Sequence, residues 1–264
     1  MSSDILSKII EAKKVQVKTA QDSMPLSKVK KIAENRIVES RFLENFSKEY
    51  NAINIIAEIK RASPSKGDIC IDLDPAKMAE SYEKGGAAAI SVLTEPDFFK
   101  GSIDDLKAVK AAVEIPVLRK DFIISEYQIY ESAAIGADAI LLIVRCLELN
   151  QLRDFMRLAD SLSLDCLVEV YSEDDVKKAI DAEATFIGIN NRNLKNFDTS
   201  IKHAISISSL LKGFQTPVAA SGIESPVDIE LNKAYGISNF LVGESIVRSG
   251  NPEQFIKQLR GTAK

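Results

Sequence analysis

Charged side chains stand at the carboxyl ends of three short apolar runs, where they could carry out acid–base chemistry. Glu58 and Lys60 end the first run, Lys120 ends a second, and Glu169 stands near the end of a third. A single charge there would be an ordinary solvated strand end, but several charges beside an apolar core are costly unless they pair with one another. Because close opposite charges also hold Lys and Glu in defined protonation states, these four residues predict a general acid–base site.

The scarcity of some residue types narrows the chemistry further. The 264 residues include one histidine, three cysteines and no tryptophan. A zinc site built on two or three histidines is therefore impossible, and a Ser-His-Asp triad would have to use His203. That residue follows a helical pattern, and we expect it to be exposed. Cys70, Cys146 and Cys166 fit neither a disulfide framework nor a metal site. General acid–base catalysis in this protein would therefore have to use Lys, Glu, Asp or Tyr side chains.

Small residues after the last two apolar runs indicate a phosphate site. Ser221-Gly222 follows one run, and Gly243-Glu244 follows the other. Small residues let backbone N–H groups approach a phosphate, whereas a glycine after one strand alone is ordinary turn chemistry. Because a carboxylate is a poor phosphate ligand, we expect Glu244 to contribute its backbone N–H. A basic segment, residues 61–67, either closes over an anionic substrate or forms a solvated surface turn.

These positions depend on a repeated pattern of apolar runs alternating with amphipathic stretches. Each run is continuously apolar, which is typical of a parallel strand buried on both faces. Eight such runs predict an α/β fold, the closed (β/α)8 or TIM barrel, whose active site lies at the carboxyl ends of the strands. An open doubly wound sheet is the alternative, but no GxGxxG motif follows the first run. The runs are 53–60, 88–93, 115–120, 138–144, 165–170, 185–190, 216–220 and 239–243.

The segment before the first run does not follow this repeat. Ile5, Leu6, Ile9 and Ile10 recur at helical spacing. The sequence shows no linker rich in Pro, Gly or Ser between this segment and the barrel. We therefore expect residues 1–264 to form a single barrel domain, with residues 1–50 as an N-terminal helical extension packed against it.

Capping residues mark several expected helix starts. Ser125 and Gln128 fit a capping box, in which the two side chains satisfy exposed backbone N–H groups of the first turn. A capping side chain directly before a proline at the first helical position is a second start signal. This second signal occurs at Asp74, Ser225 and Asn251.

Composition excludes several classes of protein. Lys and Arg number 34 against 38 Asp and Glu, and this net charge of -4 argues against a nucleic-acid binder. No run approaches the roughly 18 apolar residues of a membrane span, and the first residues lack the layout of a signal peptide. We therefore expect no membrane or nucleic-acid partner and a cytoplasmic location.

The motifs, taken in order, resemble those of the indole-3-glycerol phosphate synthase family of tryptophan biosynthesis. The resemblance implies a (β/α)8 barrel with an N-terminal helical extension that works without a cofactor or metal. It implies a phosphorylated small-molecule substrate, 1-(2-carboxyphenylamino)-1-deoxyribulose 5-phosphate, which undergoes ring closure, decarboxylation and dehydration. The matching segments are IIAEIKRASPSKG (55–67), SVLTEPDFFKGS (91–102), LRKDFII (118–124), GADAILLIVR (136–145), LVEV (167–170), IGINNRNL (187–194), SGI (221–223) and LVGES (241–245).

The same resemblance implies roles for individual residues. Lys120 falls at the position of the general acid that protonates the C2' carbonyl oxygen of the substrate during ring closure. Glu169 falls at a second acid–base position, and Lys60 and Glu58 complete the group; which of these three acts in dehydration stays open. The implied substrate ligands are Asn190 (also in the catalytic group) and Arg192 for orientation, Ser63, Ser221, Gly222, Gly243 and Glu244 for the phosphate, and Pro64, Phe99, Phe122 and Leu141 for the anthranilate ring.

One position departs from the family pattern, and other functions stay open. Ala220 stands where the family has a glutamate close to the lysine that corresponds to Lys60. A related phosphate-binding barrel, such as phosphoribosylanthranilate isomerase, is one alternative. A Schiff-base aldolase using Lys60 or Lys120 is a second. A non-catalytic barrel that only binds a ligand or a partner is a third. For the oligomeric state we expect a monomer or a weak homodimer.

Overall fold

The computed structural model describes residues 5–37, 42–46, 52–193 and 198–263. Within these residues, eight parallel strands form a closed barrel, and the last strand pairs with the first. The prediction of a (β/α)8 barrel is confirmed, and the open sheet is wrong. A separate hairpin of β2 (Ala62–Ser63) and β3 (Gly67–Asp68) follows the first strand. The barrel strands are β1 (Asn54–Ile59), β4 (Ala89–Leu93), β5 (Val117–Lys120), β6 (Ala139–Ile143), β7 (Asp165–Val170), β8 (Phe186–Asn190), β9 (Thr216–Ala220) and β10 (Asn239–Val242).

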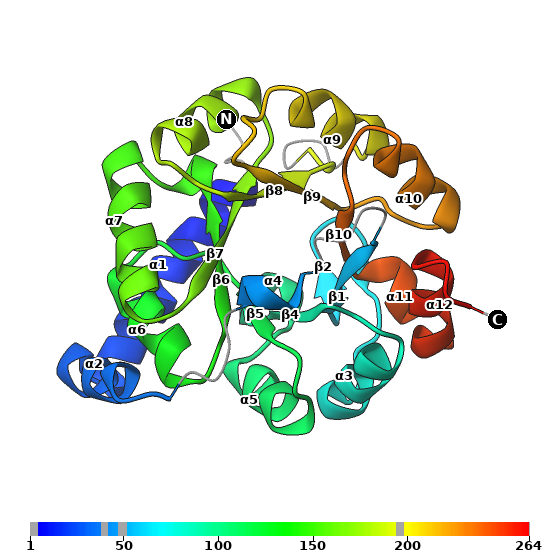
Figure 1. Ribbon diagram of the computed structural model, residues 1–264. Helices are drawn as coiled ribbons and strands as arrows, with labels where there is room; N and C mark the ends of the chain where they lie inside the picture. The colour runs from blue at the N-terminus through cyan, green and yellow to red at the C-terminus, as the bar shows by residue number, and fades with distance from the viewer. Residues whose placement is uncertain (1–4, 38–41, 47–51, 194–197, 264) are drawn as a thin grey trace.

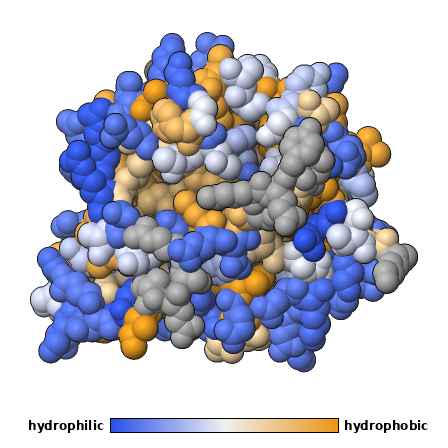
Figure 2. Space-filling view, viewed as in Figure 1, coloured by the Kyte–Doolittle hydropathy of each residue, from blue (hydrophilic) through white to orange (hydrophobic). Residues whose placement is uncertain are grey.

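Helices surround the barrel in a ring (Figure 1). Their apolar sides pack on the outward-facing strand residues, and this layer forms the larger of two hydrophobic clusters. Figure 2 shows the surface at one end of the molecule, where apolar side chains gather toward the middle and hydrophilic ones form the rim. The helices between strands are α3 (Pro75–Lys84), α4 (Pro96–Phe99), α5 (Ile103–Ala112), α6 (Glu126–Ala134), η2 (Val144–Cys146), α7 (Leu149–Ser161), α8 (Glu173–Asp181), α9 (Ile201–Ser208) and α10 (Pro226–Lys233), and α11 (Glu244–Arg248) and α12 (Pro252–Leu259) follow β10.

The predicted helix starts hold with two corrections. Ser125 caps α6 by accepting the N–H of Tyr127. Gln128, however, accepts the N–H of Ile124 at 2.9 Å rather than that of Ser125, so the capping box expected there is only half formed. Of the three caps before prolines, Asp74 and Asn251 accept backbone N–H groups of the following helix as predicted. The hydroxyl of Ser225 instead donates to the carboxylate of Asp228 at 3.0 Å, and that carboxylate accepts the N–H of Ser225 at 2.8 Å.

The second hydrophobic cluster fills the inside of the barrel and is closed by residues from the N-terminal segment. In the 3-10 turn η1 (Phe42–Asn45), Phe42 is fully buried. Its neighbour Phe46 packs edge-on against Phe186 of β8, with ring centroids 5.1 Å apart. The carboxylate of Asp165, at the start of β7, accepts the N–H of Leu43 at 2.9 Å. The turn therefore closes the end of the barrel at which the strands begin.

Two helices precede this turn, α1 (Ile5–Ser23) and α2 (Leu26–Glu34). Both helices pack against α6, where the hydroxyl of Tyr127 donates to the carbonyl oxygens of Ala20 and Met24 at 3.0 Å each. Ile9 is buried on the inner face of α1. Residues 1–4, 38–41 and 47–50 of the expected extension lie outside the described residues.

None of the helices in the described part of the chain combines the length and the apolar character needed to cross a membrane.

Candidate active site

A cavity of about 650 Å³ opens at the carboxyl ends of the barrel strands. Parallel strands of a barrel bring their ends to one rim, so residues far apart in the sequence meet there. Every candidate site residue named from the sequence lies on the wall of this cavity. These residues are Glu58, Lys60, Ser63, Pro64, Phe99, Lys120, Phe122, Leu141, Glu169, Asn190, Arg192, Ser221, Gly222, Gly243 and Glu244.

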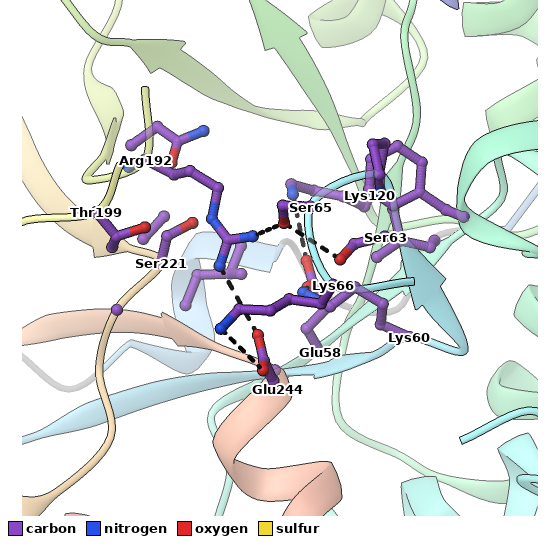
Figure 3. A pocket seen from close by; sticks show the side chains of 18 of the residues that line it. Glu58, Lys60, Ser63, Ser65, Lys66, Lys120, Arg192, Thr199, Ser221 and Glu244 are labelled. Atoms are coloured by element: carbon purple, nitrogen blue, oxygen red, sulfur yellow. Dashed lines mark hydrogen bonds and ion pairs between the residues drawn. The ribbon is translucent and has the colours of Figure 1, made fainter. Parts of the chain in front are cut away.

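Glu58 joins two lysines at the centre of the site. Its Oε1 lies 2.7 Å from Nζ of Lys60, and its Oε2 lies 3.2 Å from Nζ of Lys120 (Figure 3). Burial alone raises the pKa of this carboxyl, but the two ammonium groups outweigh burial and set the pKa to about 2. Glu58 is therefore ionised at any pH near neutrality. A group that holds its charge this firmly is suited to fixing the two lysines rather than to exchanging protons.

Gly243 makes this position of Glu58 sterically feasible. A Cβ atom at residue 243 would lie 2.7 Å from Oε1 and 3.0 Å from Cβ of Glu58, closer than real contacts allow. The residue expected to bind phosphate therefore also makes room for the central carboxylate.

Lys120 and Glu169 both have pKa values above their ordinary range, which keeps Lys120 protonated and makes Glu169 more basic. Burial lowers the pKa of Lys120, but the carboxylates of Glu58 and Glu169 outweigh it, and the pKa lies above its ordinary value. Burial raises the pKa of Glu169 above its ordinary value, against the opposing effects of Lys120 and Asn190. A carboxyl with a raised pKa is a stronger base than an ordinary one when ionised, so Glu169 is the better proton acceptor of the two glutamates.

Asn190 ties Glu169 to the next loop. Its side-chain amide donates to Oε1 of Glu169 at 3.2 Å, and its side-chain oxygen accepts the backbone N–H of Arg192 at 3.0 Å. One amide thus orients the base and fixes the start of the segment that carries the Arg192 guanidinium.

The loop after β9 has the backbone conformation expected of an anion site. Ser221 and Gly222 have φ values of 70° and 76°, in the left-handed region. A non-glycine residue there stores strain, which commonly marks a functional loop. A Cβ atom at residue 222 would lie 2.6 Å from Cγ2 of Thr199, so the loop requires glycine. The hydroxyl of Ser245 donates to the carbonyl oxygen of Ile223 at 2.7 Å and ties this loop to the loop after β10.

Glu244 has a side-chain role that the sequence did not indicate. Its carboxylate lies 3.8 Å from Lys66, 3.8 Å from Arg192 and 3.2 Å from Arg248. Figure 3 shows Lys66 and Arg192 directed at this carboxylate, while Arg192 also donates to the hydroxyl of Ser65. These are cations that a phosphate group would attract, so the carboxylate of Glu244 competes with such a ligand for them.

The segment 61–67 combines both alternatives, because part of it lines the cavity while Pro64, Lys66 and Gly67 are exposed to solvent. It forms the β2–β3 hairpin, and Ser63, Pro64 and Lys66 line the cavity. Arg61 turns away from the cavity and binds the carboxylate of Asp105 on α5. This ion pair anchors the base of the hairpin.

Part of the cavity wall is apolar. Phe99 and Phe122 pack with their ring centroids 6.0 Å apart, and Pro64 and Leu141 continue the wall. Sequence reasoning missed the side chains that α1 adds to it. These side chains are Ile5, Leu6 and Ile9. Their helical spacing in the sequence indicated a buried face of the helix, but it did not show that this face covers the cavity.

Other residues depart from the sequence prediction or were absent from it. His203 is half-buried rather than exposed, because its ring stacks on Tyr171 with centroids 4.4 Å apart and its Nε2 lies 2.7 Å from the carbonyl oxygen of Tyr171. Ala220 lies on the cavity wall and is buried. Further polar wall residues that were not among the predicted site residues are Ser65, Lys66, Asp121, Asp198, Thr199, Glu224, Ser245 and Arg248.

Comparison with known proteins identifies the family. A family model described as indole-3-glycerol phosphate synthase matches residues 6–259. The indole-3-glycerol phosphate synthase of Desulfosudis oleivorans is 51% identical over 98% of this chain and 99% of its own. That of Ruminiclostridium cellulolyticum is 43% identical over 98% of this chain and 100% of its own. The structure of 3-hexulose-6-phosphate synthase from Salmonella typhimurium shares the fold, with a TM-score of 0.63 and 14% identity over 80% of this chain and 98% of its own. This chain belongs to the indole-3-glycerol phosphate synthase family.

Proposed function

We propose that the cavity residues divide the synthase reaction among themselves, with Lys120 and Glu169 as the main acid and base. The enzyme is a carboxy-lyase of tryptophan biosynthesis that acts on a phosphorylated small molecule. Its substrate carries a carboxylate on an aromatic ring, a ketone at C2' and a terminal phosphate. The observation that carries the proposal is the buried arrangement of two lysines around Glu58, with the raised pKa of Glu169 beside it.

Ring closure needs a proton donor at the ketone. The ring carbon that carries the carboxylate attacks C2', and the nitrogen lone pair supplies the electrons and becomes an iminium. The ketone oxygen takes a proton from the ammonium of Lys120, which its raised pKa keeps charged. Holding two reacting carbons in contact can itself supply several kcal/mol, about 7 to 11 in well-oriented systems. The apolar wall beside Phe99 and Phe122 suits the aromatic half of the substrate.

Loss of CO2 and of water completes the reaction. The electron pair of the departing carboxylate returns to the iminium, which restores the aromatic ring. Glu169 then takes a proton from C1', and the C2' hydroxyl leaves as water with a proton from Lys60. Lys60 takes this role because Lys120 has already given up its proton. Two protons are donated and one is accepted, so one proton comes from solvent.

We assign different ligands to the two anionic ends of the substrate. Arg192, oriented by Asn190, suits the carboxylate. The left-handed loop at Ser221 and Gly222 and the first turn of α11 offer backbone N–H groups to the phosphate.

The decisive experiment follows the fluorescent indole product. Purified protein is mixed with the substrate in the presence of EDTA, and product formation is expected well above the rate without protein. Tight binding of a reduced substrate analogue without any turnover would instead identify a barrel that binds ligand only. A covalent adduct trapped by borohydride would identify a Schiff-base aldolase, and we expect none. Conversion of phosphoribosylanthranilate would support the related isomerase.

Ala220 offers a gain-of-function prediction. Ala220→Glu places a third carboxylate at the end of β9, among the positive charges of Lys60, Lys120 and Arg192. We expect kcat to rise, because the added carboxylate orients an ammonium group or relays a proton. Ala220→Gln, which has the same shape but no charge, is the matched control. A tenfold or larger fall in kcat for Ala220→Glu would contradict the prediction.

Glu244 should act on substrate binding rather than on chemistry. Glu244→Gln removes the charge that competes with the phosphate for Lys66 and Arg248 and with the substrate carboxylate for Arg192, so we expect KM to fall about threefold to tenfold with kcat unchanged. Glu230→Gln, on the exposed side of α10, controls for the change in net charge. The prediction fails if KM rises, which would mean that Glu244 orders the cations for the substrate.

Three further properties belong to the same proposal. Residues 1–264 act as one barrel domain, with residues 1–50 as an extension that contributes to the site, which the cavity-lining residues of α1 support. The protein works as a monomer or weak homodimer, since described residues of one chain suffice to line the cavity. The cytoplasm is the proposed location, which the free state of Cys70, Cys146 and Cys166 supports.

A further inference from the structure

A buried group of charges surrounds the end of β5, next to the lysine proposed as general acid. Asp121 follows Lys120 directly, and its side chain is 1% exposed. Its carboxylate accepts from Nζ of Lys13 on α1 at 2.6 Å and from the Arg119 guanidinium at 3.2 Å. The hydroxyl of Thr94, just after β4, donates to it at 2.7 Å. Asp121 is thus held from α1, from β5 and from the end of β4.

The charges of this group cancel only when all four of its charged side chains are counted. Arg119 also pairs with Glu131 of α6 at 2.8 Å, so two positive and two negative side chains neutralise one another. Burial raises the pKa of Asp121, but Arg119 and Lys13 outweigh burial and hold the pKa below its ordinary value. Removing one member leaves an uncompensated charge in a buried position, which is strongly unfavourable. The group therefore has one preferred arrangement.

Lys120 lies between two members of this group in the chain. Side chains alternate along a strand, so Arg119 points outward while Lys120 points into the cavity. Asp121 follows the strand and lies between the two sides, because it lines this cavity as well as a second one shared with Lys13 and Arg119. The carbonyl oxygen of Lys120 also accepts the N–H of Thr94 at 3.1 Å. Fixing the residues on both sides of Lys120 fixes the direction of its side chain toward Glu58.

Lys13 connects this arrangement to the wall of the active site. Ile5, Ile9 and Lys13 are spaced four residues apart, so they lie on one face of α1. The first two line the cavity, and the third reaches Asp121. The position of α1 over the cavity and the position of the end of β5 are therefore coupled through one buried ion pair.

We propose that Lys13 is a positioning residue, which acts through Asp121 to hold Lys120 in the geometry needed for proton transfer. The proposal rests on the role of Lys120 in the proposed function. It assigns to the N-terminal helix an effect on the chemical step in addition to its place in the cavity wall.

The test compares Lys13→Met with Lys14→Met. The neighbour Lys14 is exposed and pairs with exposed Glu11, so its replacement controls for loss of a charge on the same helix. We expect Lys13→Met to lower kcat at least about tenfold with KM changed less than about threefold, because a shift of about 1 Å in a catalytic group is costly. Lys13→Arg, which keeps the charge, is expected to recover most of the activity, and Lys14→Met to resemble the wild type.

The pH profile separates positioning from stability. If Lys120 moves away from Glu58, its pKa falls, so the alkaline limb of kcat shifts to lower pH in Lys13→Met. Asp121→Asn should show the same shift, and the double variant should lose no more activity than the worse single variant. A lower melting temperature with unchanged kcat and unchanged alkaline limb would overturn the proposal.

Two further variants keep the result interpretable. If Lys13→Met does not fold, Thr94→Val removes one uncharged hydrogen bond to Asp121, and a smaller fall in kcat is expected; an unchanged kcat overturns the proposal. Lys120→Met tests the underlying function. Full activity of that variant would refute the role of Lys120, whereas an inactive Lys120→Met with a fully active Lys13→Met would refute only the positioning role.

Discussion

Lys120→Met should lower kcat by about 10²- to 10⁴-fold, the usual contribution of a positioned general acid. Methionine preserves most of the buried side-chain volume, and Glu58 keeps Lys60 as an ion-pair partner, so the variant should still fold. The proton that the ketone oxygen needs during ring closure is then missing. Steady-state product fluorescence at saturating substrate gives kcat.

Substrate binding and stability provide the controls for this variant. KM or the Kd of a reduced analogue should change little, because the phosphate and carboxylate ligands remain. Lys84→Met, on exposed α3, should match the wild type in activity. A loss of kcat smaller than about tenfold would show that another group protonates the ketone.

Glu169→Gln should have the second largest effect, a fall in kcat of about a hundredfold or more, because the amide cannot take the C1' proton. The pKa of Glu169 lies above its ordinary value of 4.5, so in the wild type the acid limb of kcat should lie above that pH. Activity falls as pH drops through this pKa because the base becomes protonated. In Glu169→Gln this acid limb should disappear.

The stability of Glu169→Gln tests the same pKa shift independently. A carboxyl whose pKa is raised by folding is stabilising at low pH and loses that contribution as pH rises through its folded pKa. At pH 7 the glutamine variant avoids the cost of a buried ionised carboxylate. Its Tm at pH 7 should therefore be no lower than that of the wild type. A large drop in Tm together with a retained acid limb would contradict the assignment of Glu169 as the base.

The fold and most of the site could be predicted from the sequence because each rests on local patterns. A strand buried on both faces must be apolar throughout, so Glu58, Lys120 and Glu169 stand out at strand ends. Alternation within β1 also places Glu58 and Lys60 on one side. The barrel then brings strand ends together regardless of sequence separation.

Other features depend on tertiary contacts that no local pattern shows. The bridge from Glu58 to Lys120 requires the register and closure of the barrel. The ion pair of Lys13 with Asp121 joins the first helix to the residue that directly follows β5. His203 illustrates the same limit, since its ring is covered by Tyr171 from another loop.

The missing Cβ atom of Gly243 has a consequence for protein engineering. The loop after β10 is a natural place to alter which anionic group the enzyme accepts. Any side chain introduced at residue 243, however, would push against the carboxylate of Glu58 and so against both lysines that it holds. Redesign of the phosphate end and retention of proton transfer at the other end are therefore not independent problems, and residue 243 has to stay glycine while the residues around it are varied.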